Sequence, residues 1–473
     1  MKKMSALKKI ALLLLAVVMT YSCDNDDDSI IVEDPLNIVE TAVATADLSN
    51  LVAALQAADG DLVNVLSGNG PFTVLAPTNA AFATFLTDNN FASLADVPTD
   101  VLAQVLLNHV ISGKVESTDL AASGSGYAKT NATGAGGNAM SIYFDTSNGV
   151  RFNDVASVET PDVMASNGVV HIVDAVIGLP SVVDHALANS NFSNLVASLQ
   201  AADGDLISVL SGAGPFTVLA PSDVAFGTFL SDNGFAGLGD VPTDVLSQVL
   251  LNHVLGATIL STDLVTAGAG YNNTSATGAG GNAMSIYFNT NNGVTFNGIS
   301  SVTEADVVGT NGIIHAVDAV IGLPTVVDFA LADPTFETLV AALTRSDLTF
   351  DYVTTLSTPD GTSPAPFTVF APTNTAFGDL LTELGAGSLA DIDEPTLKAT
   401  LDHHAVAGAN VRSSSLMDNM TVSTLGGDIT ANITGGATLT DANDRISNIV
   451  AVDVQAANGV IHAIDKVILP DLN

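Results

Sequence analysis

Beyond its N-terminal segment, the chain begins with a helical pattern. Between Leu51 and Leu66, apolar residues recur every three or four positions, which predicts an amphipathic helix. Asp59 and Gly60 interrupt this pattern, so we expect the helix to break there. Residues 72–76 are rich in aromatic and β-branched residues and are followed by a proline, which predicts a short strand.

The next hundred residues contain patterns typical of helices and patterns typical of strands. Thr78 or Asn79 can cap a helix with phenylalanines on one face, and the segment 97–100 can begin another helix. Residues 142–144 and 150–152 flank a polar turn, which predicts a hairpin. The nearly unbroken apolar run 169–177 predicts a buried central strand.

Glycine-rich stretches separate these elements, and we expect loops at 123–126 and 134–138. Helices therefore fall mostly in the first half of this region and strands mostly in the second half. This order predicts an α+β fold.

Long internal repeats dominate the chain. The string PFTVLAPTNAAF at 71–82 returns at 215–226 and at 366–377. A second string, NGVVHIVDAVIGLP, is found at 167–180 and returns in similar form at 311–324 and 458–470. The first two repeats keep a constant offset of 144 residues, whereas the third has a seven-residue insertion that we place within 357–365.

A unit of this length is a whole domain and not a solenoid repeat. We therefore predict three tandem domains at 36–180, 181–324 and 325–473, joined with almost no linker.

The N-terminus resembles a bacterial lipoprotein signal. Basic residues precede an apolar stretch at 10–19, which is too short to span a bilayer. Cys23, the single cysteine of the chain, follows this stretch. We expect 1–22 to be a signal peptide, Cys23 to carry the lipid, and 23–35 to be an acidic tether. The alternative is ordinary cleavage near Ser22, which would release a soluble protein.

Charge excludes one class of partner. The formal net charge is −38, with 50 Asp and Glu against 12 Lys and Arg. Such a surface repels phosphate backbones, so we expect no nucleic-acid binding. Adsorption to anionic lipid without an anchor is disfavoured for the same reason.

The repeated strings, together with LLNHV at 106–110, resemble the conserved blocks of the fasciclin (FAS1) domain family. The resemblance implies a β-sandwich or wedge with packed helices in each repeat. It also implies a non-enzymatic adhesion protein that needs no cofactor. Its partners would be cell-surface or extracellular-matrix proteins or polysaccharides, and the protein would lie in the cell envelope. We expect an outer-membrane lipoprotein that faces outward, or otherwise a secreted protein.

Six histidines occupy equivalent places in the repeats, and they are His109, His253, His404, His171, His315 and His462. His109 lies on one helix face with Val101 and Val105, and His171 lies within the apolar run 169–173, which is typical of buried histidines with structural hydrogen bonds. A metal or catalytic role is the alternative. The spacing matches no zinc motif, and we expect no metal site.

The resemblance also implies a binding motif before the last strand. In animal fasciclin proteins, a similar stretch is the proposed integrin-recognition motif, which nominates Asp162, Val163 and Met164. The counterparts, nominated less firmly, are Asp306, Val307, Asp453 and Val454. The alternative is that each aspartate caps a turn. The tyrosine of the family's tyrosine-histidine pair is replaced by Asn108, Asn252 and His403.

Two other functions stay open at this point. A glycan-binding surface lipoprotein would need aromatic platforms, and Tyr127 and Tyr271 are the obvious candidates in a chain without tryptophan. A hydrolase would need a nucleophile beside a base or a bound metal, and no pattern in the sequence indicates either.

Overall fold

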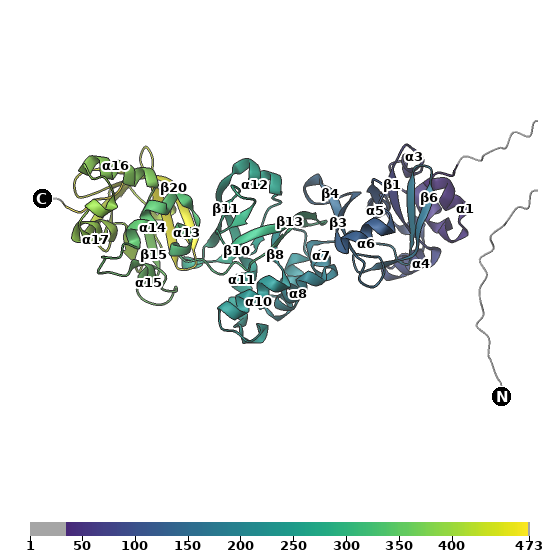
Figure 1. The fold of residues 1–473 in the computed structure, drawn as a ribbon, viewed down its shortest axis with the longest axis horizontal. Helices are drawn as coiled ribbons and strands as arrows, with labels where there is room; N and C mark the ends of the chain where they lie inside the picture. The colour runs from purple at the N-terminus through teal and green to yellow at the C-terminus, as the bar shows by residue number, and fades with distance from the viewer. Residues whose placement is uncertain (1–34, 472–473) are drawn as a thin grey trace, which may run out of the picture. The chain divides into compact units, whose positions relative to one another are not determined.

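The computed structural model describes residues 35–471. Each repeat combines helices with a seven-stranded sheet (Figure 1). The expected signal peptide at 1–22, the expected lipidation site at Cys23 and nearly all of the expected tether at 23–35 lie outside the described residues. In the first repeat the elements are α1 Ile38–Ala44, α2 Ser49–Ala57, α3 Leu62–Ser67, β1 Phe72–Pro77, α4 Asn79–Asp88, α5 Thr99–Asn108, β2 Val110–Ser112, α6 Ser117–Ser123, β3 Ser125–Thr133, β4 Ala139–Asp145, β5 Arg151–Phe152, β6 Ala156–Ala165 and β7 Gly168–Val173.

The second repeat follows the same order. Its elements are α7 Val182–Ala188, α8 Ser193–Ala201, α9 Leu206–Leu210, β8 Phe216–Pro221, α10 Asp223–Asp232, α11 Thr243–Leu251, β9 Val254–Leu255, α12 Ser261–Ala267, β10 Ala269–Thr277, β11 Ala283–Asn289, β12 Thr295–Phe296, β13 Ser300–Val308 and β14 Gly312–Val317.

The third repeat differs in its middle. Its elements are α13 Val326–Ala332, α14 Glu337–Leu343, α15 Tyr352–Leu356, β15 Phe367–Pro372, α16 Asn374–Leu384, α17 Glu394–Asp402, β16 Ala405–Ala407, β17 Met420–Ser423, β18 Asp428–Asn432, β19 Thr438–Thr440, β20 Ile446–Ala456 and β21 Gly459–Ile464. A 3₁₀ turn at Ser413–Ser415 stands where the first two repeats have a helix.

The two strings that recur in sequence contain two strands that pair in parallel in each sheet. In the first repeat β1 runs parallel to β7, with Phe72 opposite Gly168 and Leu75 opposite His171. Strands β3 to β7 then follow one another in antiparallel order. A contact between β2 and β3 closes this sheet into a barrel.

Apolar helix faces and the central strands form the cores. Thr78 caps α4 by accepting a hydrogen bond from the backbone of Ala81, and Phe82 of that helix is buried against β1. Each repeat has separate hydrophobic clusters on the two sides of its sheet. The predicted α+β fold is confirmed.

Several boundaries differ from the sequence-based expectations. The expected loop at 123–126 is partly wrong, because β3 already begins at Ser125. The central strand β7 ends at Val173 and not near residue 177. Strand β6, which contains Asp162, was not expected, because its polar residues hide the alternation of a strand.

Among the described residues, no single helix has both the length and the apolar composition needed to cross a membrane. One bent pair, Ile38–Ala44 with Ala46–Ala57, meets these criteria only when its two parts are counted together.

Candidate functional site

Asp162 lies at a β-bulge and caps a helix. The register of β6 against β7 shifts between Thr160 and Val163, and Asp162 adopts a positive φ of 58° there. Its Oδ1 accepts a hydrogen bond from the backbone N–H of Ser117 at 2.8 Å, and its Oδ2 accepts one from the Ser117 hydroxyl at 2.5 Å. Burial alone would raise the pKa of Asp162, but the bonds from Ser117 outweigh burial and hold the pKa below its usual value.

The buried side chain of His171 stabilises the same bulge. Its Nδ1 accepts a hydrogen bond from the backbone N–H of Asp162 at 3.2 Å, so its Nε2–H donates to the carbonyl oxygen of Val115 at 2.9 Å. Both ring nitrogens are therefore used in holding one backbone conformation.

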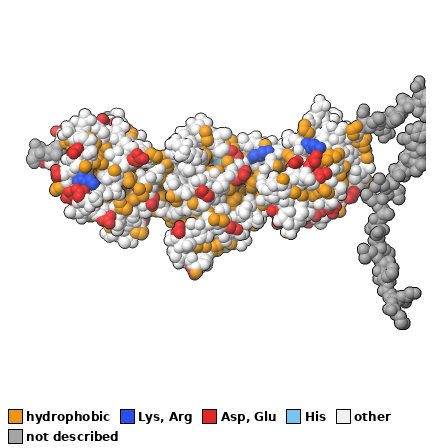
Figure 2. Space-filling model, viewed as in Figure 1, with side chains coloured by type: hydrophobic (Ala, Val, Ile, Leu, Met, Phe, Trp, Pro, Cys, Tyr) orange, Lys and Arg blue, Asp and Glu red, His pale blue; other side chains and the backbone are white. Residues whose placement is uncertain are grey.

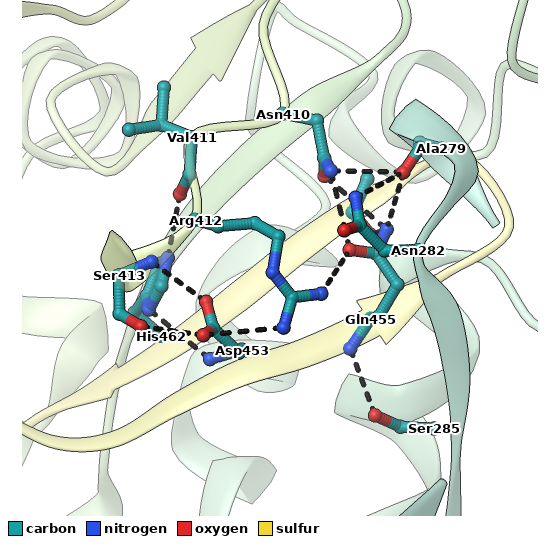
Figure 3. Close-up of polar contacts among 11 residues, drawn as sticks. Ala279, Asn282, Ser285, Asn410, Val411, Arg412, Ser413, Asp453, Gln455 and His462 are labelled. Carbon is teal, nitrogen blue, oxygen red and sulfur yellow. Dashed lines mark hydrogen bonds and ion pairs between the residues drawn. The ribbon is translucent and has the colours of Figure 1, made fainter. Parts of the chain in front are cut away.

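The second and third repeats reproduce this arrangement. Asp306 pairs with Ser261 and His315, and Asp453 pairs with Ser413 and His462, through equivalent hydrogen bonds. Burial lowers the pKa of both His315 and His462. In the third repeat the guanidinium of Arg412 also lies 3.3 Å from Asp453 Oδ2 (Figure 3).

His109, His253 and His404 each follow a helix and link it to the segment after the last strand of the same repeat. His109 Nδ1 lies 2.7 Å from the Val105 carbonyl oxygen, and its Nε2 accepts from the backbone N–H of Ile177 at 2.9 Å. His253 and His404 make the same bonds. Burial lowers the pKa of each of the three to about 4. All six repeated histidines are buried and hydrogen-bonded, as predicted.

The end of β13 forms a joint with the preceding repeat. The backbone N–H of Val308 donates to Ser141 Oγ on β4 at 2.9 Å. The Ala135 N–H donates to the carbonyl oxygen of Gly309 at 2.8 Å, and Lys129 Nζ donates to the backbone oxygen of Asp306. Val307 and Val308 are buried. We call this contact joint 1.

The third repeat forms an equivalent contact, joint 2, with the second. The backbone N–H of Gln455 donates to Ser285 Oγ on β11 at 3.0 Å. The Gln455 side-chain amide donates to the carbonyl oxygen of Ala279 at 3.2 Å, and Asn410 donates to the same oxygen at 3.0 Å (Figure 3). Val454 and Gln455 are buried.

The tyrosines proposed as glycan platforms also belong to these joints. The Tyr127 hydroxyl accepts from Asn189 at 3.2 Å, and its ring lies edge-on to His185 at 5.7 Å. The Tyr271 hydroxyl donates to Asp333 at 2.9 Å, and its ring packs against Phe329 at 5.8 Å. Contacts between repeats therefore occupy both rings.

In the first repeat the same strand edge has no covering repeat. Met164 is the counterpart of Val308 and Gln455, and it is 52% exposed. The side chain of Asp162 is 27% exposed, and Val163 is partly buried. No part of residues 35–471 covers Met164 as β4 covers Val308. We call Asp162, Val163 and Met164 the open edge.

The structure thus separates the nominated residues into two groups. Asp162, Val163 and Met164 lie on the open edge, whereas Val307 and Val454 are buried near the joints, where a partner meets them only if the joint opens. Sequence reasoning missed the joint residues Ser141 and Ser285. The constant offset of 144 residues shows only that they are equivalent.

Within residues 35–471, no group of three or more His, Cys, Asp or Glu side chains is placed to hold a metal ion. On the face shown in Figure 2, basic side chains are few and isolated, whereas acidic side chains are spread over the surface. This distribution agrees with the net charge of −38.

Comparisons with known proteins agree with the internal repeats. A fasciclin domain family model matches residues 46–180, 190–324 and 334–470. Protein sll1483 of Synechocystis is 38% identical over 145 residues, which cover 31% of this chain and 74% of that protein.

Longer matches come from animals. The transforming growth factor-beta-induced protein ig-h3 of Oryctolagus cuniculus is 27% identical over 475 residues, which cover 97% of this chain and 60% of that protein. Human periostin is 27% identical over 368 residues, covering 76% of this chain and 39% of that protein. The chain therefore spans less than two thirds of these animal relatives.

Among solved structures, a FAS1 domain pair from the insect cell adhesion molecule fasciclin I is 19% identical, with a TM-score of 0.38. That match covers 60% of this chain and 98% of the other chain.

Proposed function

The chain belongs to the fasciclin domain family, and from that premise we propose that it is a non-enzymatic adhesion protein outside the cell, anchored by a lipid on Cys23. Fasciclin domains are the domains of adhesion proteins, which supports the general role. The partner that we propose is a cell-surface or extracellular-matrix protein or polysaccharide, bound at the open edge of the first repeat.

One observation carries the choice of this surface. The edge that ends at Met164 is exposed, whereas its counterparts at Val308 and Gln455 are buried under the preceding repeat. Joints 1 and 2 indicate that this edge can hold another polypeptide, because both use its backbone N–H groups as donors. An exposed methionine adds an adaptable apolar contact.

A capture experiment tests this surface. Mature protein is immobilised and exposed to whole cells and to matrix polymers. Met164→Arg is expected to lower capture at least tenfold, because it places a bulky charge on the edge. Met417→Arg is the matched control, because Met417 is a methionine of the third repeat that is exposed at 61%, against 52% for Met164. Equal capture by both variants would contradict a site at the open edge.

The anchor needs its own test, because a failed anchor would leave the binding surface intact. Cys23→Ser removes the only thiol of the chain. We expect the wild-type protein in the membrane fraction with an acyl mass on its N-terminus, and the variant in the soluble fraction. Mass spectrometry of a wild-type N-terminus cleaved near Ser22 would instead support a secreted protein.

A further inference from the structure

We propose that the third repeat contains a binding pocket for the alkyl chain of a small, uncharged amphiphile. A cavity of about 280 Å³ lies between α13, α14 and α15, beside β15 and β21. Its walls include Ala330, Leu339, Val340 and Leu356, and its lining is apolar apart from Thr344 and Tyr352. Thr344 and Val353 are exposed, so the cavity reaches the surface between α14 and α15.

The first repeat shows the same site almost closed. The cavity there is about 20 Å³, against about 280 Å³ in the third repeat. Most of its lining residues are counterparts of those in the third repeat, with Ala42 for Ala330 and Leu51 for Leu339, although Leu106 and His109 line only the smaller cavity. A large cavity is therefore not a general property of this fold.

A short insertion accounts for the difference. Asn167 donates to the carbonyl oxygen of Leu66 at 2.8 Å, and Asn458 donates to that of Leu356 at 2.7 Å, so these two leucines are counterparts. The stretch from Leu339 to Leu356 in the third repeat is two residues longer than the corresponding stretch from Leu51 to Leu66 in the first repeat. The prediction that the whole insertion falls within 357–365 is therefore wrong by two residues. The added length lies in the connection between α14 and α15, at 344–351, which corresponds to 58–61 between α2 and α3.

A tyrosine then directs its polar end away from the cavity. Tyr352 stands where the first repeat has Leu62. Its hydroxyl donates to Asp402 Oδ1 at 2.5 Å and also lies 3.1 Å from the carbonyl oxygen of Lys398, both on α17. The ring packs against Phe350 with centroids 4.7 Å apart. Only the apolar part of Tyr352 is left to line the cavity.

The chemistry of the walls selects the ligand. The hydroxyl of Thr344 donates to the carbonyl oxygen of Val340 at 2.8 Å, so both polar side chains of the lining already have partners. A polar group inside the cavity would lose its hydrogen bonds to water without replacement. An alkyl chain needs no such bonds and gains from burial.

Size and charge define the ligand further. An apolar cavity of about 150 Å³ holds one benzene ring, so about 280 Å³ suits an alkyl chain of roughly ten to twelve carbons. The protein carries a formal charge of −38, which disfavours an anionic head group at the rim. We therefore name a neutral head, such as an alcohol.

Calorimetric titration of the mature protein with 1-decanol tests the pocket. We expect saturable binding of one molecule per chain. Affinity should rise roughly fourfold for each methylene from 1-hexanol to 1-decanol. Val340→Phe should fill the pocket and lower the affinity at least tenfold. Val52→Phe is the matched control at the counterpart position in the first repeat, and it should leave binding unchanged.

Two results would overturn the proposal: no saturable binding by the wild-type protein, or equal binding by Val340→Phe and Val52→Phe. If circular dichroism shows that Val340→Phe does not fold, Ala330→Leu fills the pocket from α13 and decides the question. Loss of binding in this variant supports the pocket, and retained binding overturns it.

Discussion

The open edge of the first repeat and the covered edges of the other two repeats have the same fold but different surroundings. Met164 is exposed, whereas Val308 and Gln455 are buried beneath a neighbouring repeat. The bulge, the aspartate and the histidine beneath the edge are the same in all three repeats. The aspartate therefore has a structural role in all three repeats. The residues that follow it determine what the edge contacts.

The two joints also differ from each other. Joint 1 contains His185 where joint 2 contains Phe329, and each ring packs edge-on to a tyrosine of the preceding repeat. His185 Nε2 lies 3.2 Å from the carbonyl oxygen of Val308, while its buried Nδ1 has no hydrogen-bond partner in the described part of the chain. Joint 1 therefore contains a titratable group at a position where joint 2 has none.

The largest effect should come from a charge placed in joint 1. Val308→Arg buries an unpaired cation, and such a burial typically costs about 3–5 kcal/mol. Met164→Arg places the same charge on the open edge, where the change should stay within about 0.5 kcal/mol. Calorimetry of both full-length variants measures the two effects. Equal destabilisation would show that the edge of the first repeat is covered as well.

Acid should affect the two joints differently. Burial lowers the pKa of His185 to about 4, with Asp184 opposing this shift and Lys129 adding to it. Between pH 4 and the unfolded value of about 6.5, the unfolded chain binds more protons, so stability falls as the pH falls through this window. From pH 7 to pH 5 this one residue should remove about 2 kcal/mol of stability.

The variant His185→Phe makes joint 1 resemble joint 2. Urea unfolding at pH 7 and pH 5 should then show a smaller loss than in the wild-type protein, by about 2 kcal/mol. The rest of the chain is identical in the two proteins, so its contribution cancels in this difference. An unchanged acid sensitivity would mean that His185 is not buried at the joint in solution.

Local patterns predicted the elements whose residues are uniformly apolar. Residues 72–76 predicted β1, and Asp59 with Gly60 predicted the break between α2 and α3. Strands β3 and β6 were not predicted from the sequence, because they contain many polar residues.

The candidate site was less predictable, because its contacts join distant residues. Asp162 bonds to Ser117, 45 positions earlier, and Val308 bonds to Ser141, 167 positions earlier. Repetition in the sequence showed which residues are equivalent. It did not show that one copy of the edge is open and two are covered, because that depends on the packing of repeat against repeat.

Removing a single hydrogen bond at a joint should have a smaller effect. Ser141→Ala leaves the buried N–H of Val308 without its acceptor, which should cost about 1–2 kcal/mol. Ser285→Ala does the same to Gln455 in joint 2 and should cost a similar amount. Chemical unfolding of each variant gives these values. A cost in one joint alone would show that the two joints are not energetically equivalent.

A smaller loss of stability than at the joints should come from the aspartate of the open edge itself. Asp162→Ala deletes both acceptors of Ser117, the first residue of α6, which should cost about 1 kcal/mol. Because the carboxylate is engaged with Ser117, capture of cells or matrix should fall less than in Met164→Arg. If Asp162→Ala instead abolishes capture while the first repeat keeps its thermal transition, the carboxylate itself contacts the partner. That result would move the binding role from Met164 to Asp162.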